Sequence, residues 1–433
     1  MNAALKKRSN VRWGVFTLVF LATAINYLDR SNMSVAGTTI MGDLHLSKVE
    51  FGVLSSAFFW SYTLMQIPVG AIVDRLGARL TYAIAVIWWS LAQMGVAVAR
   101  SFGALIGMRV LMGIGEAPVF PTNARIIADW LPSKERGLAN GLSSMGMAVG
   151  AGLMTPVVAW IVETFGWGVS FIVTGLLGLL WTLAWLVIFR NKPEDSNASK
   201  EEIEYIRSEQ LQEEVQPKSG FKWYQFLKKR NVWVLLYGLF AQDYLLFLIL
   251  TWLPTYLVVA KHMTLIKAGF NSILPWVVAA IGAIVGGKLS DYLIQRGWSS
   301  INARRFVLTV GTLLCAVIIP AAFTESIPLA LTLISIAMGG MMLANSNVWA
   351  VLADIAPRDS IGILSGLQNF VGNISGWIAP IITGYLADKL HNFILALVIA
   401  GIVAIVGAIG YAFFLKNDDE NKNGALINNK FAK

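Results

Sequence analysis

Five ionisable side chains lie inside long apolar segments of the sequence: Asp29, Arg30, Arg109, Glu116 and Asp243. An ionised group near the centre of a bilayer is unfavourable, so it persists where it faces a water-filled cavity or pairs with another charge. Arginines bind carboxylates through paired hydrogen bonds, and carboxylic acids can take up and release protons. These residue types therefore predict a membrane-embedded site for an organic anion that is linked to protonation.

The spacing of two of these residues places them on one helical face. Arg109 and Glu116 are seven residues apart, which corresponds to two turns and about 10 Å along a helix axis. We expect this face to line a cavity, with Arg30 and Arg109 binding the anion and Asp29 and Glu116 carrying protons. A static ion-pair network of the same four residues, holding the two helices together, is the open alternative.

The charge balance suggests how the anion and the protons are linked. Two arginines and two carboxylates sum to zero, so an entering carboxylate would leave the site negative. Protonation of Asp29 and Glu116 restores the balance and frees the arginines from competing carboxylates. Asp243 has no assigned part: a second proton site, a partner for an arginine and a neutral buried acid all fit.

The elements that position these residues follow from composition. Of the 433 residues, 56% are hydrophobic and 14% are charged, against about 25% charged in soluble domains. Runs of about 20 apolar residues, each long enough to cross a bilayer core, recur along the chain and leave little room for a soluble catalytic domain. The net charge of +9 comes from Lys and Arg in connecting loops. It therefore predicts loops that follow the positive-inside rule and no nucleic-acid partner.

Hydropathy predicts twelve membrane-spanning helices in two sets of six. The first set covers about 11–35, 49–72, 78–99, 102–126, 136–160 and 166–189, and the second covers about 231–257, 266–294, 304–323, 327–350, 360–387 and 391–415. The predicted fold class is therefore an all-α integral membrane protein with two pseudo-symmetric six-helix bundles. The predicted domains are an N-terminal bundle at 1–190, a cytoplasmic linker at 191–230 with a short amphipathic helix near 200–214, and a C-terminal bundle with a short tail at 231–433.

An internal repeat supports the two-bundle organisation. Five residues recur after a constant displacement of 225 positions: Ala128, Asp129, Pro132, Gly137 and Gly141 match Ala353, Asp354, Pro357, Gly362 and Gly366. Both sets fall between the fourth and fifth helix of their half, as expected for a duplicated unit. The distribution of basic residues predicts the orientation in the membrane. If both termini are cytoplasmic, most Lys and Arg fall in cytoplasmic segments, and those in segments that face outward are Lys48, Arg100, Lys261, Lys267 and Lys389.

The sequence carries no pattern of an enzyme or a metal site. Its single cysteine, Cys315, lies in an apolar run, and His45, His262 and His391 are scattered through connecting loops. Disulfides and His/Cys metal sites are therefore excluded. No nucleophile and base occur at a recognisable spacing, and no phosphate-binding loop is present. We expect no catalytic residues and no cofactor, with protons as the coupling ion.

A charged, glycine-containing motif connects the second and third predicted helices: Gly70, Asp74, Arg75, Gly77 and Arg79. Its carboxylate can hold a helix end or an arginine of the other half in one conformation and release it in another, which predicts conformational gating. A fragment of the motif, Gly287, Asp291 and Arg296, occupies the corresponding loop of the second half. With this signature the sequence resembles the major facilitator superfamily along its whole length.

Further fragments resemble the anion:cation symporter family within that superfamily. They are Asn26-Tyr27-Leu28-Asp29-Arg30, Arg109 with Gly113, Glu116-Ala117-Pro118, Phe120-Pro121, Trp130-Leu131-Pro132 and Glu135-Arg136-Gly137. The resemblance implies import of organic anions such as hexuronates, aldonates and aldarates together with protons in bacteria. The short first outer loop favours a bacterial inner-membrane protein over the vesicular and lysosomal animal relatives.

The resemblance also implies further substrate contacts. Tyr62, Trp349 and Asn369 fall where similar sugar-acid transporters place hydroxyl-binding or stacking groups, although Trp349 also suits an interfacial belt residue. Met147 stands where those transporters can show a glutamine, and a thioether cannot replace its two donors. Four glycines of the fifth predicted helix, Gly141, Gly146, Gly150 and Gly152, suit close helix packing better than ligand contact.

The function predicted from these features is a secondary transporter that imports a sugar acid by proton symport through alternating access. Its partners would be the anion, protons and the lipid bilayer, and we expect a monomer in the bacterial inner membrane with both termini cytoplasmic. An anion exchanger without net proton coupling and a non-transporting membrane sensor that retains the fold are the open alternatives.

Overall fold

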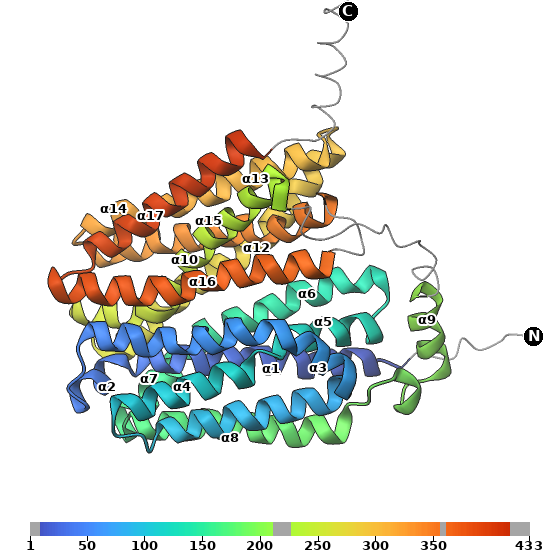
Figure 1. Cartoon of the computed structure of the whole chain (residues 1–433), viewed down its shortest axis with the longest axis horizontal. Helices are drawn as coiled ribbons and strands as arrows, with labels where there is room; N and C mark the ends of the chain where they lie inside the picture. Colours follow the sequence, from blue (N-terminus) through green and yellow to red (C-terminus); the bar gives the residue numbers. More distant parts are fainter. Residues whose placement is uncertain (1–8, 211–226, 356–360, 416–433) are drawn as a thin grey trace, which may run out of the picture. The chain divides into compact units, whose positions relative to one another are not determined.

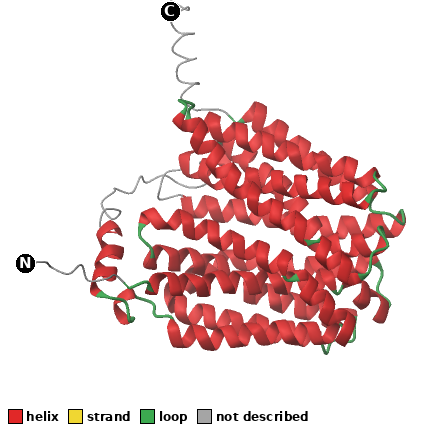
Figure 2. Cartoon of the chain, turned by 180° about the vertical axis from the view of Figure 1, so that it is seen from behind, coloured by secondary structure: helices red, strands yellow, loops and turns green. Residues whose placement is uncertain are grey.

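The computed structural model describes residues 9–210, 227–355 and 361–415, and every regular element in these ranges is a helix (Figure 2). The helices of the first half appear from blue to green in Figure 1. Their bounds are α1 Val11–Val35, α2 Gly37–Asp43, α3 Lys48–Val96, α4 Phe102–Glu116, α5 Val119–Trp130, α6 Ser133–Ala148, the π-helix η1 Val149–Leu153, α7 Thr155–Phe165 and α8 Trp167–Ile188.

The helices that follow include a short pair in the linker region. Their bounds are the 3-10 helix η2 Pro193–Asp195, α9 Lys200–Gln210, α10 Arg230–Val259, α11 Leu265–Asn271, α12 Ile273–Gln295, α13 Ser300–Leu314, η4 Cys315–Val317, α14 Ile318–Phe323, α15 Ile327–Ile355, α16 Ile361–Lys389, α17 Ile394–Ile409 and η6 Gly410–Phe414. Helix α9 confirms the predicted amphipathic helix over Lys200–Gln210, and the rest of that predicted range lies outside the described residues.

Helix α3 contains two crossings joined at Gly77, whose φ of 75° is left-handed and suits glycine. Ser61, before Gly77, donates to the Val110 carbonyl at 2.7 Å, and Trp88, after it, donates to the Leu111 carbonyl at 2.8 Å. In one straight helix residues 61 and 88 would lie about 40 Å apart. The chain therefore reverses direction at Gly77. The residues on both sides of this glycine are helical, so both arms carry the label α3.

The described residues contain ten other helical segments that are long and apolar enough to cross a membrane. Together with the two arms of α3 they match the twelve predicted helices, with boundaries that differ by a few residues. The all-α integral membrane fold is confirmed.

The structure corrects one local prediction. Gly70, Asp74 and Arg75 lie in the helical arm that ends at Gly77, so the predicted loop between the second and third helices reduces to a turn at that glycine.

The fourth predicted helix is confirmed as a single span over Phe102–Trp130. Its hydrogen bonding breaks between α4 and α5, because Pro118 has no N–H to donate to the carbonyl four residues earlier. Glu116 is consequently the last residue of α4.

The described helices group into two compact units. The first contains the described parts of Met1–Lys218, Leu250–Trp276 and Pro380–Asn392, and the second contains those of Ser219–Ile249, Val277–Ala379 and Phe393–Lys433. Helices α10, α12 and α16 contribute to both.

Close helix packing in the first unit depends on glycine. A side chain at Gly150, in η1, would collide with the carbonyl of Ala24 in α1, and one at Gly146 would come within 2.9 Å of the Phe20 carbonyl. These contacts let α1 run against α6 and η1 with their backbones in near contact, and they confirm the predicted packing role of both glycines. Gly152 also packs closely, because an added carbon there would lie 2.6 Å from the Trp276 side chain. The packing prediction was wrong for Gly141, where an added carbon meets nothing within 4 Å. Helix α1 also packs on α8, and α3 packs on both α4 and α8.

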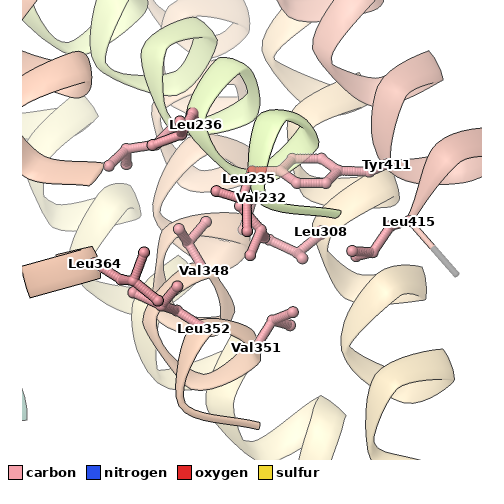
Figure 3. Packing of buried hydrophobic residues seen from close by; sticks show 12 residues of the cluster. Val232, Leu235, Leu236, Leu308, Val348, Val351, Leu352, Leu364, Tyr411 and Leu415 are labelled. Atoms are coloured by element: carbon pink, nitrogen blue, oxygen red, sulfur yellow. The ribbon is translucent and has the colours of Figure 1, made fainter. Parts of the chain in front are cut away.

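The second unit has a continuous aliphatic core, shown in Figure 3. Its buried members come from α10, α13, α15, α16 and the end of the last helix: Val232, Leu235, Leu236, Leu239, Leu308, Ala344, Val348, Val351, Leu352, Leu364, Tyr411 and Leu415. Lipid tails are as apolar as these side chains, so close van der Waals packing among them holds the helices of this unit together.

Candidate functional site

The last two turns of α1 and the end of α4 meet through a buried ion pair in the first unit. The Nε of Arg30 donates to Oε2 of Glu116 at 2.7 Å, and the side chains are 3% and 0% exposed. A charge-assisted hydrogen bond in such a setting is strong, and removal of either partner would leave the other charge buried and uncompensated.

Aromatic rings surround the Arg30 guanidinium. Its central carbon lies 4.9 Å from the ring centroid of Tyr27 and 4.7 Å from those of Phe58 and Tyr62. Tyr62 is buried and stacks on Phe58, with 5.4 Å between their centroids. Planar guanidinium groups are well suited to such faces. The structure thus brings together Arg30 and Tyr62, which the sequence assigned to substrate binding.

Arg109, in α4, is buried as Arg30 is, but its environment is different. Its guanidinium carbon lies 5.0 Å from the Phe58 centroid, and Nη1 donates to the sulfur of Met112 at 3.2 Å. Among the described residues, Arg109 forms no ion pair with a carboxylate, and its Nε has no hydrogen-bond partner. Arg109 is therefore a buried cation that is not neutralised by a direct contact.

Asp29 is fully buried in α1, next to Arg30 in sequence. Neither of its carboxylate oxygens has a hydrogen-bond partner in the part of the chain that the structure describes, and Trp89 and Thr174 are its polar neighbours. Gln93 contacts both Asp29 and Thr174, since its side-chain amide donates to the Asp29 carbonyl at 3.5 Å and to the Thr174 hydroxyl at 3.0 Å. Of the four charges predicted to form the site, one direct pair forms, and no closed network of described contacts links all four.

A pocket in the first unit contains both arginines. It encloses about 280 Å³, its open side included. Besides Arg30 and Arg109 it is lined by apolar and hydroxyl-bearing side chains from α1, α3 and α10, namely Met33, Ser34, Ser55, Phe58, Phe59, Leu250 and Thr251. Ser55 was not predicted from the sequence, although its spacing from Phe58, Phe59 and Tyr62 places it on the same helical face.

The predicted gating residues of the first half lie at the turn around Gly77. Asp74 forms an ion pair with Arg125 at 3.2 Å, and Arg125 also pairs with Asp129 at 2.7 Å. The partner of Asp74 is thus an arginine of the same half, whereas the predicted arginine belonged to the other half. The backbone N–H of Arg79 donates to the side chain of Asn191 at 2.9 Å. Gly70 and Arg75 are exposed. Arg125 was not predicted from the sequence, and its position four residues before Asp129 was the available signal.

The remaining predicted residues lie in the second unit. Trp349, in α15, has 38% of its surface exposed, and Asn369, in α16, accepts a hydrogen bond from the side chain of Asn373. Asp291 is exposed in the last turns of α12 and not in the loop that was predicted for it. Asp243, in α10, has its carboxylate against the backbone of Gly372. No group of three or more metal-ligating side chains occurs among the described residues.

These features define a polytopic helical membrane protein with a pocket inside its first unit that is lined by two buried arginines. The family model of the Major Facilitator Superfamily matches residues 19–380, and the chain belongs to that family. Its membership confirms the predicted transporter class and the prediction that the protein is not an enzyme.

Curated relatives and solved structures agree with this assignment. The chain is 36% identical to a D-galactonate transporter of Escherichia coli O6:H1, over 95% of this chain and 96% of the relative. It is 31% identical to a hexuronate transporter of Bacillus subtilis, over 93% and 94%. A bacterial homologue of the human lysosomal transporter Spinster, in an inward-facing and occupied conformation, has the same fold, with a TM-score of 0.74 and 20% identity over 94% of this chain and 97% of that one.

Proposed function

We propose that the protein imports a sugar acid together with protons by alternating access. The observation that carries the proposal is the contrast between the two buried arginines of the pocket, since Glu116 neutralises Arg30 while Arg109 has no carboxylate of a described residue in direct contact. A buried cation of this kind favours a visiting anion. The names of the relatives, which include galactonate and hexuronate transporters, indicate the class of anion.

The Arg30–Glu116 pair supplies a mechanism for coupling. A substrate carboxylate and the Glu116 carboxylate compete for the same guanidinium, whose planar fork matches either one. Protonation of Glu116 removes its charge and weakens its hold on Arg30. Arg30 and Arg109 can then bind the carboxylate together, and loss of the proton to the cytoplasm restores the pair and expels the anion.

Asp29 is proposed as a second proton-carrying group. It is fully buried and forms no ion pair with a described residue, so its charged form lacks direct compensation. Tyr62, Trp349 and Asn369 are proposed to contact the hydroxyl-bearing part of the substrate. Tyr62 already lies against the Arg30 guanidinium.

The turn around Gly77 is proposed as a gating element, with Gly70, Asp74, Arg75 and Arg79 in the first half and Asp291 in the second. The Asp74 and Arg125 side chains are 72% and 50% exposed. Exposed ion pairs contribute about 0–1 kcal/mol each, so this contact can break and re-form readily during a conformational cycle.

The proposed setting is the inner membrane of a bacterium. The termini and the linker at 191–230 are proposed to be cytoplasmic, with six-helix domains at 1–190 and 231–433 in a monomer. The distribution of Lys and Arg supports this orientation, because few of them fall in the segments that would face outward.

Two measurements on purified protein test the proposal. A thermal-shift screen against aldonates, aldarates and hexuronates should show stabilisation by at least one acid, because a ligand that binds the folded state raises its apparent stability. Uptake of that acid into proteoliposomes should then respond to an imposed pH gradient. Uptake that requires a counter-anion and ignores the pH gradient would identify an exchanger, and binding without uptake would identify a sensor.

A further inference from the structure

The pocket that contains Arg30 and Arg109 also contains a hydroxyl group with no partner among the described residues. Ser55, on the first arm of α3, is 3% exposed, and its Oγ forms no hydrogen bond within the described ranges. Buried hydroxyls are normally satisfied, because loss of hydration without a new hydrogen bond destabilises the fold. The Ser55 hydroxyl therefore has an unused capacity for one donated and up to two accepted hydrogen bonds.

Neighbouring serines show how unusual this is. Within helices, serine hydroxyls commonly donate to a carbonyl one turn earlier, as Ser31 does to Leu28 at 3.0 Å. Ser61 donates to the Val110 carbonyl at 2.7 Å, and the pocket residue Ser34 donates to the Thr251 carbonyl at 2.6 Å. The hydroxyl proton of Ser34 is thus already engaged in a hydrogen bond, whereas the hydroxyl proton of Ser55 is available to a ligand.

Ser55 lies on the helical face of α3 that contacts the two arginines of the pocket, Arg30 and Arg109. Residues 55, 58, 59 and 62 follow helical spacing and share one face of α3. Phe58 and Tyr62 on this face lie against the Arg30 guanidinium, and Phe58 also lies against that of Arg109. Ser55 therefore stands about one turn along the helix from Phe58, whose ring lies against both guanidiniums, and about two turns from Tyr62.

We propose that Ser55 binds the hydroxyl group at carbon 2 of the substrate and so selects 2-hydroxy acids. A sugar acid carries a carboxylate and a hydroxyl on adjacent carbons, which matches guanidinium groups and a free hydroxyl in one pocket. Phe58 and Phe59 supply apolar walls that exclude water around this pair. The inference rests on the proposed function, because it takes the substrate carboxylate to be held by Arg30 and Arg109.

The test compares two acids that differ in one hydroxyl, D-galactonate and 2-deoxy-D-galactonate, by calorimetric titration of the purified full-length protein. We expect the natural protein to bind galactonate about threefold to tenfold more tightly, the range of a neutral hydrogen bond. Ser55→Ala should bind both acids with equal affinity. Ser61→Ala, on the same arm but bonded to Val110, is the matched control and should keep the preference.

The possible results separate this inference from the proposed function. A Ser55→Ala variant that keeps the preference for galactonate overturns the inference alone. A variant that weakens both acids equally also overturns it, because Ser55 would then contact the carboxylate. A natural protein that binds no acid of the thermal-shift panel overturns the proposed function and the inference with it.

Folding of the variant gives an independent readout. Because Ser55→Ala removes an unsatisfied buried hydroxyl, the melting temperature of the ligand-free protein should stay the same or rise, whereas Ser61→Ala should lower it by removing a formed bond. A lower melting temperature for Ser55→Ala would show that the hydroxyl already has a structural partner, and the inference would be wrong.

Discussion

The guanidinium of Arg30 and the carboxylate of Glu116 face each other in the interior of the first unit, with Nε and Oε2 2.7 Å apart. Arg109, seven residues before Glu116 on α4, has no such partner among the described residues. Because of this asymmetry, the two arginines are proposed to take different parts in anion binding. A structural charge network is the alternative that the following variants test.

Replacement of Glu116 by glutamine should abolish proton-driven accumulation while substrate counterflow persists. Glutamine resembles the protonated acid, so Arg30 stays free for the substrate but no proton is carried. The measurement is uptake into proteoliposomes with an imposed pH gradient, compared with exchange at equal pH. Glu163→Gln, at an exposed position of α7, should behave as the natural protein does. Accumulation against a gradient by Glu116→Gln would show that the ion pair is structural.

Replacement of Arg109 by lysine should weaken binding of the anion. Lysine keeps the charge but loses the planar fork that matches a carboxylate. The binding free energy should therefore weaken by about 1.5–3 kcal/mol, which raises the dissociation constant about tenfold to more than a hundredfold. Calorimetry with the best acid of the thermal-shift screen measures the loss, and Arg100→Lys, at an exposed loop position, serves as the control. Normal binding by Arg109→Lys would place the anion site elsewhere.

Packing of α1 against η1 should not tolerate a methyl group at Gly150. The added carbon would collide with the Ala24 carbonyl, so Gly150→Ala should force the helices apart and lower the melting temperature by several degrees. Gly141 is a matched control in the same predicted span, because a carbon built there meets nothing within 4 Å. Gly141→Ala should be neutral or stabilising, since alanine favours helix. Equal melting temperatures for both variants would show that close contact at Gly150 is unimportant.

The orientation can be checked with single cysteines after Cys315 is replaced by serine. An impermeant thiol reagent added to intact cells should label Glu325→Cys, between α14 and α15, because that segment is predicted to face outward. It should leave Glu204→Cys, on α9 in the predicted cytoplasmic linker, unlabelled until the membrane is opened. Both positions are exposed, so access to the reagent is limited by the membrane alone. The reverse labelling pattern would invert the proposed topology.

Much of this protein was determined by the sequence alone. Apolar runs of spanning length must become helices in a bilayer, because no water is present there to satisfy an open backbone. The number of helices, their approximate ends and the superfamily follow from these runs and from the motifs around Gly77 and Glu116. The rarity of charge in such runs also singles out candidate site residues, namely Asp29, Arg30, Arg109, Glu116 and Asp243.

The tertiary structure decided which of those charges meet. Helical spacing places Arg109 and Glu116 on one face, but it cannot tell that Arg30, from a helix more than 80 residues away in sequence, takes Glu116 while Arg109 remains without a carboxylate among the described residues. It likewise could not show that Ser55 is left without a partner in these ranges while Ser34 is satisfied by the carbonyl of Thr251. Local sequence sets periodicity and burial, whereas contacts between distant helices depend on how all the side chains pack at once.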